Sequence, residues 1–230
     1  MTFTRGLRDG IPICLGYYAV SIAFGLLAVS QGLTALEAVL ISATNLTSAG
    51  QFAGLTIIAA MGSYVEMALT QLVINLRYML MSISLSQKVD EKFTGIWRFI
   101  LGFGITDEIY AVAVGQESVS RQYFAGLMAL PILGWSGGTL TGAILGNVLP
   151  EIITNALGVA LYGMFIAIVI PAARDSRPVL FAAAVSIAVS MILRYIPLFA
   201  GISGGFAIII CALTASALAA VLYPVEEESA

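Results

Sequence analysis

The chain has 230 residues, of which 60% are hydrophobic and only 10% are charged, and its formal net charge is −3. An ordinary soluble domain is about a quarter charged, so this composition indicates a protein that crosses a membrane several times. The chain is not basic enough to bind nucleic acid, and the absence of histidine removes the base that most nucleophilic enzymes require. We expect an all-α polytopic membrane protein with about 7–8 membrane segments, because the apolar stretches are much longer than the strands of a membrane barrel.

The first two segments combine a plain span with an interrupted one. Residues 10–30 form the first expected span, and Arg5 and Arg8 before it place the N-terminus in the cytoplasm by the positive-inside rule. The second segment, 36–61, is interrupted by the polar stretch SATNLTSAGQFAG at 42–54. Broken helices at membrane depth coordinate charged groups of substrates in transporters, whereas a polar, tightly packed helix pair is the alternative. We therefore expect substrate-binding residues at Asn45, Ser48, Gly50 and Gln51.

The third segment, 64–86, is an expected span that carries Glu66, Asn75 and Arg77. We add Asn75 and Arg77 to the expected substrate site. Arg77 lies within reach of a helix end, so its side chain is expected to snorkel to the interface. An ion pair with a carboxylate in the membrane is the alternative role of Arg77. The charged loop KVDEKFTGIWR that follows is expected to lie in water or at the interface.

The fourth segment holds two adjacent carboxylates, Asp107 and Glu108, in the apolar stretch FGITDEIYAV. A carboxylate at the bilayer centre costs about 2.5 kcal/mol or more, so retaining two indicates a function. Neighbours on a helix point about 100° apart, so the two groups have different surroundings. A helix end close to the interface is the alternative explanation.

We expect Glu108 to be the main proton-coupling group, with Asp107 as the second candidate. In one continuous helix Glu108 shares its face with Gly104, Ala111 and Gly115, which suggests the more enclosed setting. A carboxyl group buried without a partner takes up a proton, which is what a proton-coupled carrier needs. Asp107 is expected to bind the α-amino group of a substrate or to form an ion pair with a residue such as Arg77.

The fifth segment, 122–148, is rich in glycine. Four glycines recur every four residues and share one helix face, which lets another backbone come close. The sequence leaves open whether that neighbour is another segment of this chain or another chain. For a second subunit, this helix-packing face is the candidate docking surface; its members are Gly134, Gly138, Gly142 and Gly146. GWSGG also matches the nucleophile motif of serine hydrolases, but Ser136 has no histidine to activate it. The sequence contains no cofactor or metal-ligating motif.

Two pairs of similar stretches indicate an internal repeat. NLRYML at 75–80 resembles ILRYIP at 192–197, and IPICLG at 11–16 resembles LPILG at 130–134. They suggest that residues 10–87 and 122–196 are duplicated within a single transporter domain, 1–230, although chance similarity of apolar segments is the alternative. Many transporters hold their substrate between inverted repeats, and we expect an inverted arrangement here.

The distribution of Lys and Arg leaves two topologies open. If the second segment spans the membrane, the 88–98 loop lies outside and Arg121 lies inside. If the second segment is re-entrant, the two exchange sides, and only this option inverts the repeats. We expect the re-entrant option.

Five stretches occur in an order that resembles the AzlC family, the large subunit of bacterial branched-chain amino-acid exporters. They are FGLLA, SAGQF, NLRYML, TDEIYAV and GWSGGTLTGAILGN. The resemblance covers essentially the whole chain. It implies efflux of leucine, isoleucine, valine and their analogues across the inner membrane, together with a small hydrophobic AzlD-type subunit. A non-transporting membrane subunit remains an alternative, and an intramembrane enzyme is disfavoured by the missing histidine.

Overall fold

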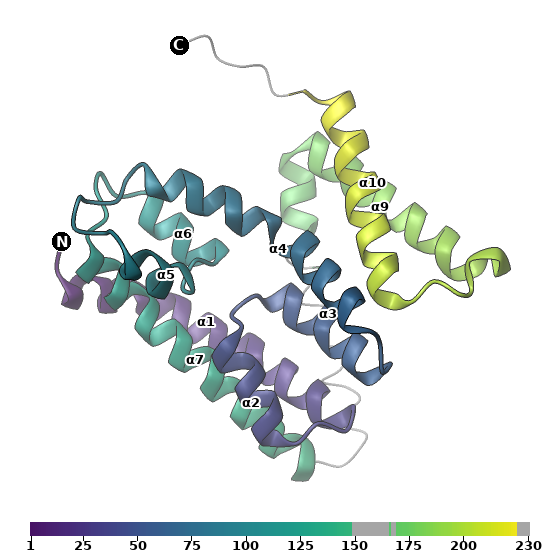
Figure 1. Ribbon diagram of the computed structural model, residues 1–230, viewed down its shortest axis with the longest axis horizontal. Helices are drawn as coiled ribbons and strands as arrows, with labels where there is room; N and C mark the ends of the chain where they lie inside the picture. The colour runs from purple at the N-terminus through teal and green to yellow at the C-terminus, as the bar shows by residue number, and fades with distance from the viewer. Residues whose placement is uncertain (149–165, 167–168, 225–230) are drawn as a thin grey trace. The chain divides into compact units, whose positions relative to one another are not determined.

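The described part of the chain is helical, as Figure 1 shows for the computed structural model. The structure describes residues 1–148, 166 and 169–224. Five helices among these residues are long and apolar enough to cross a membrane. The prediction of an all-α polytopic membrane protein is therefore confirmed.

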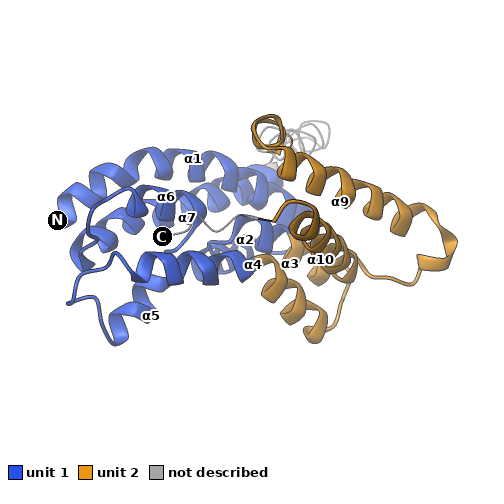
Figure 2. Cartoon of the chain, turned by 90° about the horizontal axis from the view of Figure 1, so that it is seen from above, with its two compact units in different colours: residues 1–52, 75–158 blue, residues 53–74, 159–230 orange. Residues whose placement is uncertain are grey.

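The chain forms two compact units (Figure 2). Unit 1 consists of residues 1–52 and 75–158, and unit 2 consists of residues 53–74 and 159–230. The helices are α1 (Phe3–Ser30), α2 (Ala35–Thr44), α3 (Ser48–Ala59), α4 (Tyr64–Ser86), α5 (Ile96–Gly102), α6 (Asp107–Val114), α7 (Arg121–Val148), α9 (Arg177–Tyr195), the 3-10 turn η1 (Pro197–Phe199) and α10 (Gly204–Leu222).

Unit 1 is built around α1 and α7, which lie side by side and run parallel (Figure 1). Gly10 near the start of α1 lies against Leu127 near the start of α7. Further along, Gly134 lies against Cys14, and Gly142 lies against Ile22. A Cβ atom on Gly134 would lie 2.6 Å from the Cys14 carbonyl oxygen, so only glycine permits this approach.

The glycine face of α7 is covered by α1 of the same chain. Gly138 faces the backbone of Tyr18, and Gly146 faces the side chain of Val29, in continuation of the contacts made by Gly134 and Gly142. The expectation that this face docks a second subunit is therefore wrong. Its flat surface is already used to bring two helices of unit 1 together.

The parallel course of α1 and α7 also corrects the expected inversion of the repeat. Each helix has 28 residues with one internal proline, Pro12 in α1 and Pro131 in α7. These helices begin the two expected repeats, and inverted copies would run antiparallel. Duplication of 10–87 and 122–196 itself stays a prediction, and residues 149–165 of the second copy lie outside the described residues.

The first broken helix, α2–α3, enters unit 1 from the end where α1 finishes and turns back. Leu46, in the break between the two helices, packs in the same cluster as Ile13 and Tyr17 of α1. Phe52 of α3 then packs against Phe24, which lies about two turns beyond Tyr17 on α1. The two ring centroids are 5.5 Å apart. The break expected inside 42–54 is thus found at residues 45–47.

A second break separates α5 from α6, where one continuous helix was expected. Trp97, near the start of α5, stacks with Arg121 at the start of α7, 4.6 Å from guanidinium carbon to ring centroid. Thr106 reaches Tyr17 in the middle of α1, and Gln116 just beyond α6 accepts a hydrogen bond from Arg5 at 3.1 Å. The α5–α6 pair therefore enters from the N-terminal end of α1 and returns to it.

These contacts place both charged loops at one end of unit 1. The amide of Val119 donates to the Lys88 carbonyl at 2.8 Å, and the Ser120 hydroxyl donates to the Met1 carbonyl at 2.8 Å. Both expected topologies are therefore wrong, because each put the 88–98 loop and Arg121 on opposite sides. Neither allowed for an α5–α6 pair that does not cross.

Six of the ten basic side chains gather at this end, which by the positive-inside rule favours a cytoplasmic position for it. They are Arg5, Arg8, Lys88, Lys92, Arg98 and Arg121. The short connection 31–34 at the other end of unit 1 carries no basic residue. The cytoplasmic N-terminus stays a prediction that this grouping supports.

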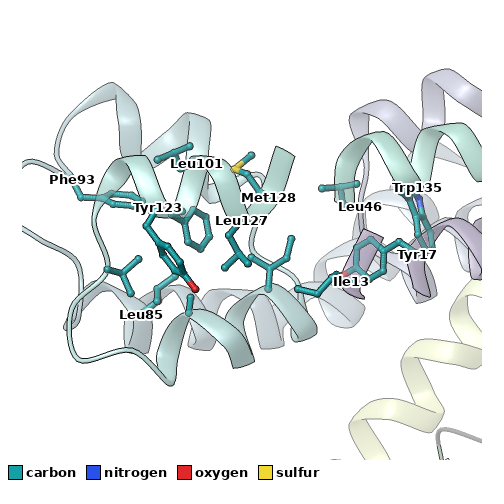
Figure 3. Close-up of a cluster of buried hydrophobic side chains, with 14 residues drawn as sticks. Ile13, Tyr17, Leu46, Leu85, Phe93, Leu101, Tyr123, Leu127, Met128 and Trp135 are labelled. Atoms are coloured by element: carbon teal, nitrogen blue, oxygen red, sulfur yellow. The ribbon is translucent and has the colours of Figure 1, made fainter. Parts of the chain in front are cut away.

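The buried core of unit 1 follows α1 and α7 from the charged end to the two helix breaks. Figure 3 shows Phe93 and Leu101 at one end of this cluster and Tyr17, Leu46 and Trp135 at the other. The two breaks are thus joined by packed side chains in the middle of the unit.

Candidate functional site

The α2–α3 break is ordered by local hydrogen bonds that leave polar groups open. Asn45 ends α2 in an extended conformation, and its Oδ1 accepts a hydrogen bond from the Thr47 amide at 3.0 Å. The hydroxyl oxygen of Thr47 is buried and has no hydrogen-bond partner in the part of the chain that the structure describes. Helix α3 starts at the next residue, Ser48, and first-turn amides have no acceptor within their own helix.

A closed network of four buried polar side chains holds this break against α7. Gln51 donates to the Ser42 hydroxyl at 2.9 Å, and Ser42 lies 2.7 Å from the Thr139 hydroxyl. The indole N–H of Trp135 donates to Gln51 Oε1 at 2.6 Å. The expected role of Gln51 in binding substrate is untested, but its amide is engaged on both sides, so the geometry favours a positioning role.

Tyr17 connects the two breaks. Its ring meets the Trp135 ring edge-on, with 5.2 Å between centroids. Its hydroxyl donates to Glu108 Oε2 at 2.5 Å and lies 2.5 Å from Thr106 Oγ1. A chain of contacts thus runs from the first turn of α6 to the first turn of α3. It consists of the hydrogen bond at Tyr17, the ring contact between Tyr17 and Trp135, and the hydrogen bond from Trp135 to Gln51.

Asp107 and Glu108 occupy the first turn of α6. Thr106 caps this helix, with its side chain accepting a hydrogen bond from the Ile109 amide. Carboxylates at a helix N-terminus are stabilised by the helix dipole, which is one physical reason for two adjacent acids. Glu108 is exposed on unit 1 whereas Asp107 is half-buried. The prediction of a more enclosed Glu108 is wrong, because Gly104 precedes the helix and does not share its face.

Arg77 forms an ion pair with Asp107. The structure therefore shows the alternative role of Arg77, and not the expected snorkelling of its side chain to the interface. Its guanidinium Nη1 lies 2.9 Å from Asp107 Oδ2, and both side chains are about half exposed, at 47% and 44%. The guanidinium also donates to the Tyr78 hydroxyl at 3.1 Å and lies over that ring. The pair therefore ties α4 to the first turn of α6.

The structure brings only some of the predicted site residues together. Asn45 and Ser48 flank the α2–α3 break, and the buried Gly50 lies in the first turn of α3. Asn75 lies in α4, two residues before Arg77, and is half-buried. The sequence reasoning missed Tyr17, Thr106, Trp135 and Thr139. Thr-Asp-Glu at 106–108 carried a usable signal, because a threonine followed by acids is typical of a helix start.

A cavity of about 300 Å³ opens between α4, α5 and the loop that joins them. Its wall is mostly apolar and runs from Arg98 near the charged end to Ile105 at the α5–α6 break. The remaining lining residues are Met79, Ser82, Ile83, Leu85, Ser86, Val89, Phe93, Leu101, Gly102 and Phe124. The cavity could admit a small apolar molecule from the charged end of unit 1. In the described residues, no group of three or more His, Cys, Asp or Glu side chains is arranged to hold a metal ion.

The chain has apolar helices that are long enough to span a membrane. Two helix breaks meet inside unit 1, and polar groups lie at their junction. These features define a multi-pass helical membrane protein with an internal polar site. The AzlC protein family matches residues 12–149, more than half of the chain. The chain belongs to the AzlC family.

Curated relatives agree with this assignment. A membrane protein of Archaeoglobus fulgidus is 30% identical over 171 residues, which cover 74% of this chain and 75% of the relative. The inner membrane protein YgaZ of Escherichia coli is 30% identical over 172 residues, covering 71% and 70%. A Helicobacter pylori membrane protein is 28% identical over 156 residues, covering 63% and 66%. No solved structure matches the chain. The protein is thus a multi-pass inner-membrane protein, as predicted.

Proposed function

We propose that this protein exports branched-chain amino acids across the inner membrane. The observation that carries the proposal is the meeting of two broken helices at Tyr17, with a carboxylate on one side and an open helix start on the other. Family membership supports the same substrate class, because the AzlC resemblance implies efflux of leucine, isoleucine and valine.

The substrate's carboxylate is assigned to the start of α3. The unpartnered Thr47 hydroxyl and the amides of Ser48 and Ala49 supply donors for an anion. The helix dipole adds partial positive charge at the same place. Asn45 orders the break through its bond to the Thr47 amide, and the buried Gly50 belongs to the same first turn.

The substrate's α-amino group is assigned to Glu108. Its carboxylate is held by Tyr17 at 2.5 Å and has no ion-pair partner in the part of the chain described here. Asp107 already pairs with Arg77, and that pair positions the first turn of α6. Asn75, two residues before Arg77 on α4, is kept as a further candidate for the polar part of the site.

The aliphatic side chain of the substrate suits the apolar surroundings of the breaks. Leu46, Ile13 and Trp135 are buried there. The 300 Å³ cavity offers a largely apolar route from the charged, cytoplasmic end. An exporter needs such a route, because it takes its substrate from the cytoplasm.

Transport is proposed to be coupled to protons through Glu108, with Asp107 as the second group. Proton binding at Glu108 removes the charge that holds the amino group, so a proton and the substrate exclude each other at Glu108, and proton entry promotes substrate release. The Tyr17 hydroxyl can donate to the carboxylate or accept from the protonated acid, so both forms of Glu108 keep a partner.

The protein is proposed to work with a small hydrophobic AzlD-type subunit. The glycine face of α7 is not available to that partner because α1 covers it. The partner therefore binds another surface of the complex, and the pairing rests on the family resemblance.

The test uses the purified complex of this chain and its small subunit in liposomes. Leucine-loaded liposomes with an imposed pH gradient are expected to release leucine faster than liposomes that contain either subunit alone. Equal release from protein-containing and empty liposomes would overturn the proposal and favour a non-transporting membrane subunit. A Glu108→Gln complex tests the coupling: it should lose the response to the pH gradient, and its leucine exchange should persist only with a raised KM, because the charge that holds the amino group is gone.

A further inference from the structure

A second carboxylate, Glu66, is buried in unit 2 and has no role in the site described above. Glu66 lies in the first turn of α4 and is 5% exposed. Its Oε1 accepts a hydrogen bond from the Gly205 amide at 2.9 Å and a very short one from the Ser203 hydroxyl. Both donors belong to the start of α10, so a side chain of α4 caps another helix.

A glutamate three residues after the N-cap residue of a helix usually caps its own helix, and Glu66 does not. In Thr34-x-x-Glu37, the glutamate folds back and accepts from the Thr34 amide at 2.7 Å, which completes a capping box on its own helix. Ser63-x-x-Glu66 has the same spacing, and the Ser63 hydroxyl accepts from the Glu66 amide at 3.1 Å. The Glu66 carboxylate nevertheless turns away to α10, so its burial is not required to cap α4.

Within the part of the chain that the structure describes, no cation balances the charge of Glu66. No ion pair involves Glu66 in the described residues, and every polar group that touches its carboxylate is a neutral donor. Its second oxygen, Oε2, accepts no hydrogen bond from them and faces Gly62, where a Cβ atom would lie 3.0 Å away. Buried charges are ordinarily paired, so a lone carboxylate held by two donors calls for an explanation.

An unused hydroxyl lies on the same face, one turn along α4. Thr70 is fully buried, and its Oγ1 has no hydrogen-bond partner in the described residues. Residues four apart on a helix are neighbours, and Gly205 is close to both side chains: its Cβ would lie 2.5 Å from Glu66 Oε1 and 2.8 Å from Thr70 Oγ1. A buried hydroxyl without a partner therefore lies beside Gly205, on the side of Oε1, whereas Oε2 faces Gly62.

We propose that Glu66 is a proton-binding site of the transport cycle, separate from Glu108. The proton binds at Oε2, which makes the acid neutral, while Oε1 keeps the bonds from Ser203 and Gly205. Losing the charge weakens these two bonds, which clamp α4 to the start of α10.

The ligand is a proton rather than a metal cation. The Gly205 N–H points at Oε1, and a cation at that oxygen would meet the positive end of the amide and of the helix dipole. The elements around Glu66 present hydroxyls and glycines to it: Ser63 and Thr70 from α4, Gly62 from the turn before α4, and Ser203 and Gly205 from α10. None of these groups is ionisable.

The test rests on the proposed export of branched-chain amino acids and uses the full complex in liposomes. Glu66→Gln keeps the shape of the side chain and removes the proton. It is expected to retain leucine exchange without a gradient. Its rate of leucine transport under an imposed pH gradient is expected to be at least tenfold lower than that of the wild type. Glu37→Gln is the matched control, because glutamine also completes a capping box, and its gradient-driven rate should equal that of the wild type.

Two further measurements keep the proposal decidable if Glu66→Gln is unstable. Ser203→Ala removes the hydroxyl that donates to Glu66 Oε1 but not the carboxylate, and should shift the pH dependence of transport, whereas Ser203→Thr should preserve it. Infrared difference spectra between high and low pH should show a carboxylic-acid carbonyl band in the wild type that is absent from Glu66→Gln.

The outcomes separate this inference from the proposed function. If the wild type moves no leucine, the proposed function fails, and the infrared band alone then decides whether Glu66 binds a proton. If the wild type transports leucine while Glu66→Gln keeps full gradient-driven transport and its infrared band, Glu66 is a structural cap and the inference is wrong. A dependence on sodium that Glu66→Gln abolishes would also overturn it.

Discussion

The Tyr17 hydroxyl lies 2.5 Å from Glu108 Oε2, although the two residues are 91 positions apart in the chain. This bond joins the middle of α1 to the first turn of α6. Since the Tyr17 ring also packs on Trp135, one side chain connects the start of α6 with the network around the start of α3. A change at either break can therefore reach the other through a single residue.

Tyr17→Phe tests this connection. The variant removes the bond to Glu108 and keeps the ring against Trp135. A hydrogen bond to a charged group contributes about 1.5–3 kcal/mol, so kcat/KM for leucine export should fall roughly 10- to 100-fold. Tyr18→Phe is the control, because among the described residues the Tyr18 hydroxyl is hydrogen-bonded to Thr141 alone, at 2.9 Å on the exposed side. Equal activity of the two variants would show that Tyr17 acts through packing alone.

The network around Gln51 should matter more for stability than for substrate affinity. Gln51→Leu leaves the Ser42 hydroxyl and the Trp135 N–H without their partner in a buried setting, which costs about 1–3 kcal/mol for each unsatisfied group. The variant is expected to melt at a lower temperature in detergent and to keep the KM of the wild type. Gln87→Leu, on the exposed end of α4, should change neither quantity. A large rise in KM without loss of stability would instead place Gln51 in contact with substrate.

Much of the fold could be predicted from the sequence because long apolar stretches have few alternatives in a membrane. The expected segments 64–86 and 122–148 agree with α4 and α7 within one residue, and the break in 42–54 was visible from its polar residues. Pro197 also marks the interruption between α9 and α10, since proline cannot continue a helix.

The second break was missed because its residues are apolar. In FGITDEIYAV, hydropathy continues through 103–106, and only the Thr-Asp-Glu signature marks a new helix start. This one error produced the wrong face for Glu108 and both wrong topologies. The contacts of Tyr17 could not be predicted, because they depend on how α1 meets α6 and not on any local pattern.

Gly138→Ala should destabilise unit 1 rather than prevent partner binding directly. A Cβ atom at Gly138 would come closer than 3.0 Å to both the Tyr18 carbonyl oxygen and Ser21 Oγ. Such overpacking typically costs about 1–3 kcal/mol, so the melting temperature of the detergent-solubilised protein should fall.

Gly137→Ala is the matched control for this prediction. Its added Cβ would lie 3.8 Å from Tyr18 Cε2, an ordinary contact, so stability should not change. Both variants should retain the small subunit on purification for as long as they are folded. A stable Gly138→Ala protein that no longer binds the subunit would contradict the placement of α1 over this face.

The end of unit 1 that carries the charged loops should lie wholly in the cytoplasm. In a Cys14→Ala, Cys211→Ala background, Lys92→Cys and Ser118→Cys should resist a membrane-impermeant thiol reagent on intact cells and react after lysis. Gln31→Cys, at the opposite end of α1, should react on intact cells. Labelling of only one of the two loop positions from outside would mean that α5–α6 crosses the membrane, as both sequence-based topologies assumed.

The ion pair between Arg77 and Asp107 is expected to position α6 rather than to bind substrate. Its atoms lie 2.9 Å apart and both side chains are about half exposed, so the pair contributes up to about 1 kcal/mol. Asp107→Asn and Arg77→Gln should therefore each lower kcat/KM for leucine roughly fivefold, which is the factor that corresponds to about 1 kcal/mol. The exchanged pair, Arg77→Asp with Asp107→Arg, restores attraction between α4 and α6 and should recover activity to within about twofold of the wild type. If the exchanged pair stays inactive and its KM for leucine is raised as much as in Asp107→Asn, Asp107 contacts the substrate's amino group and the positioning role is wrong.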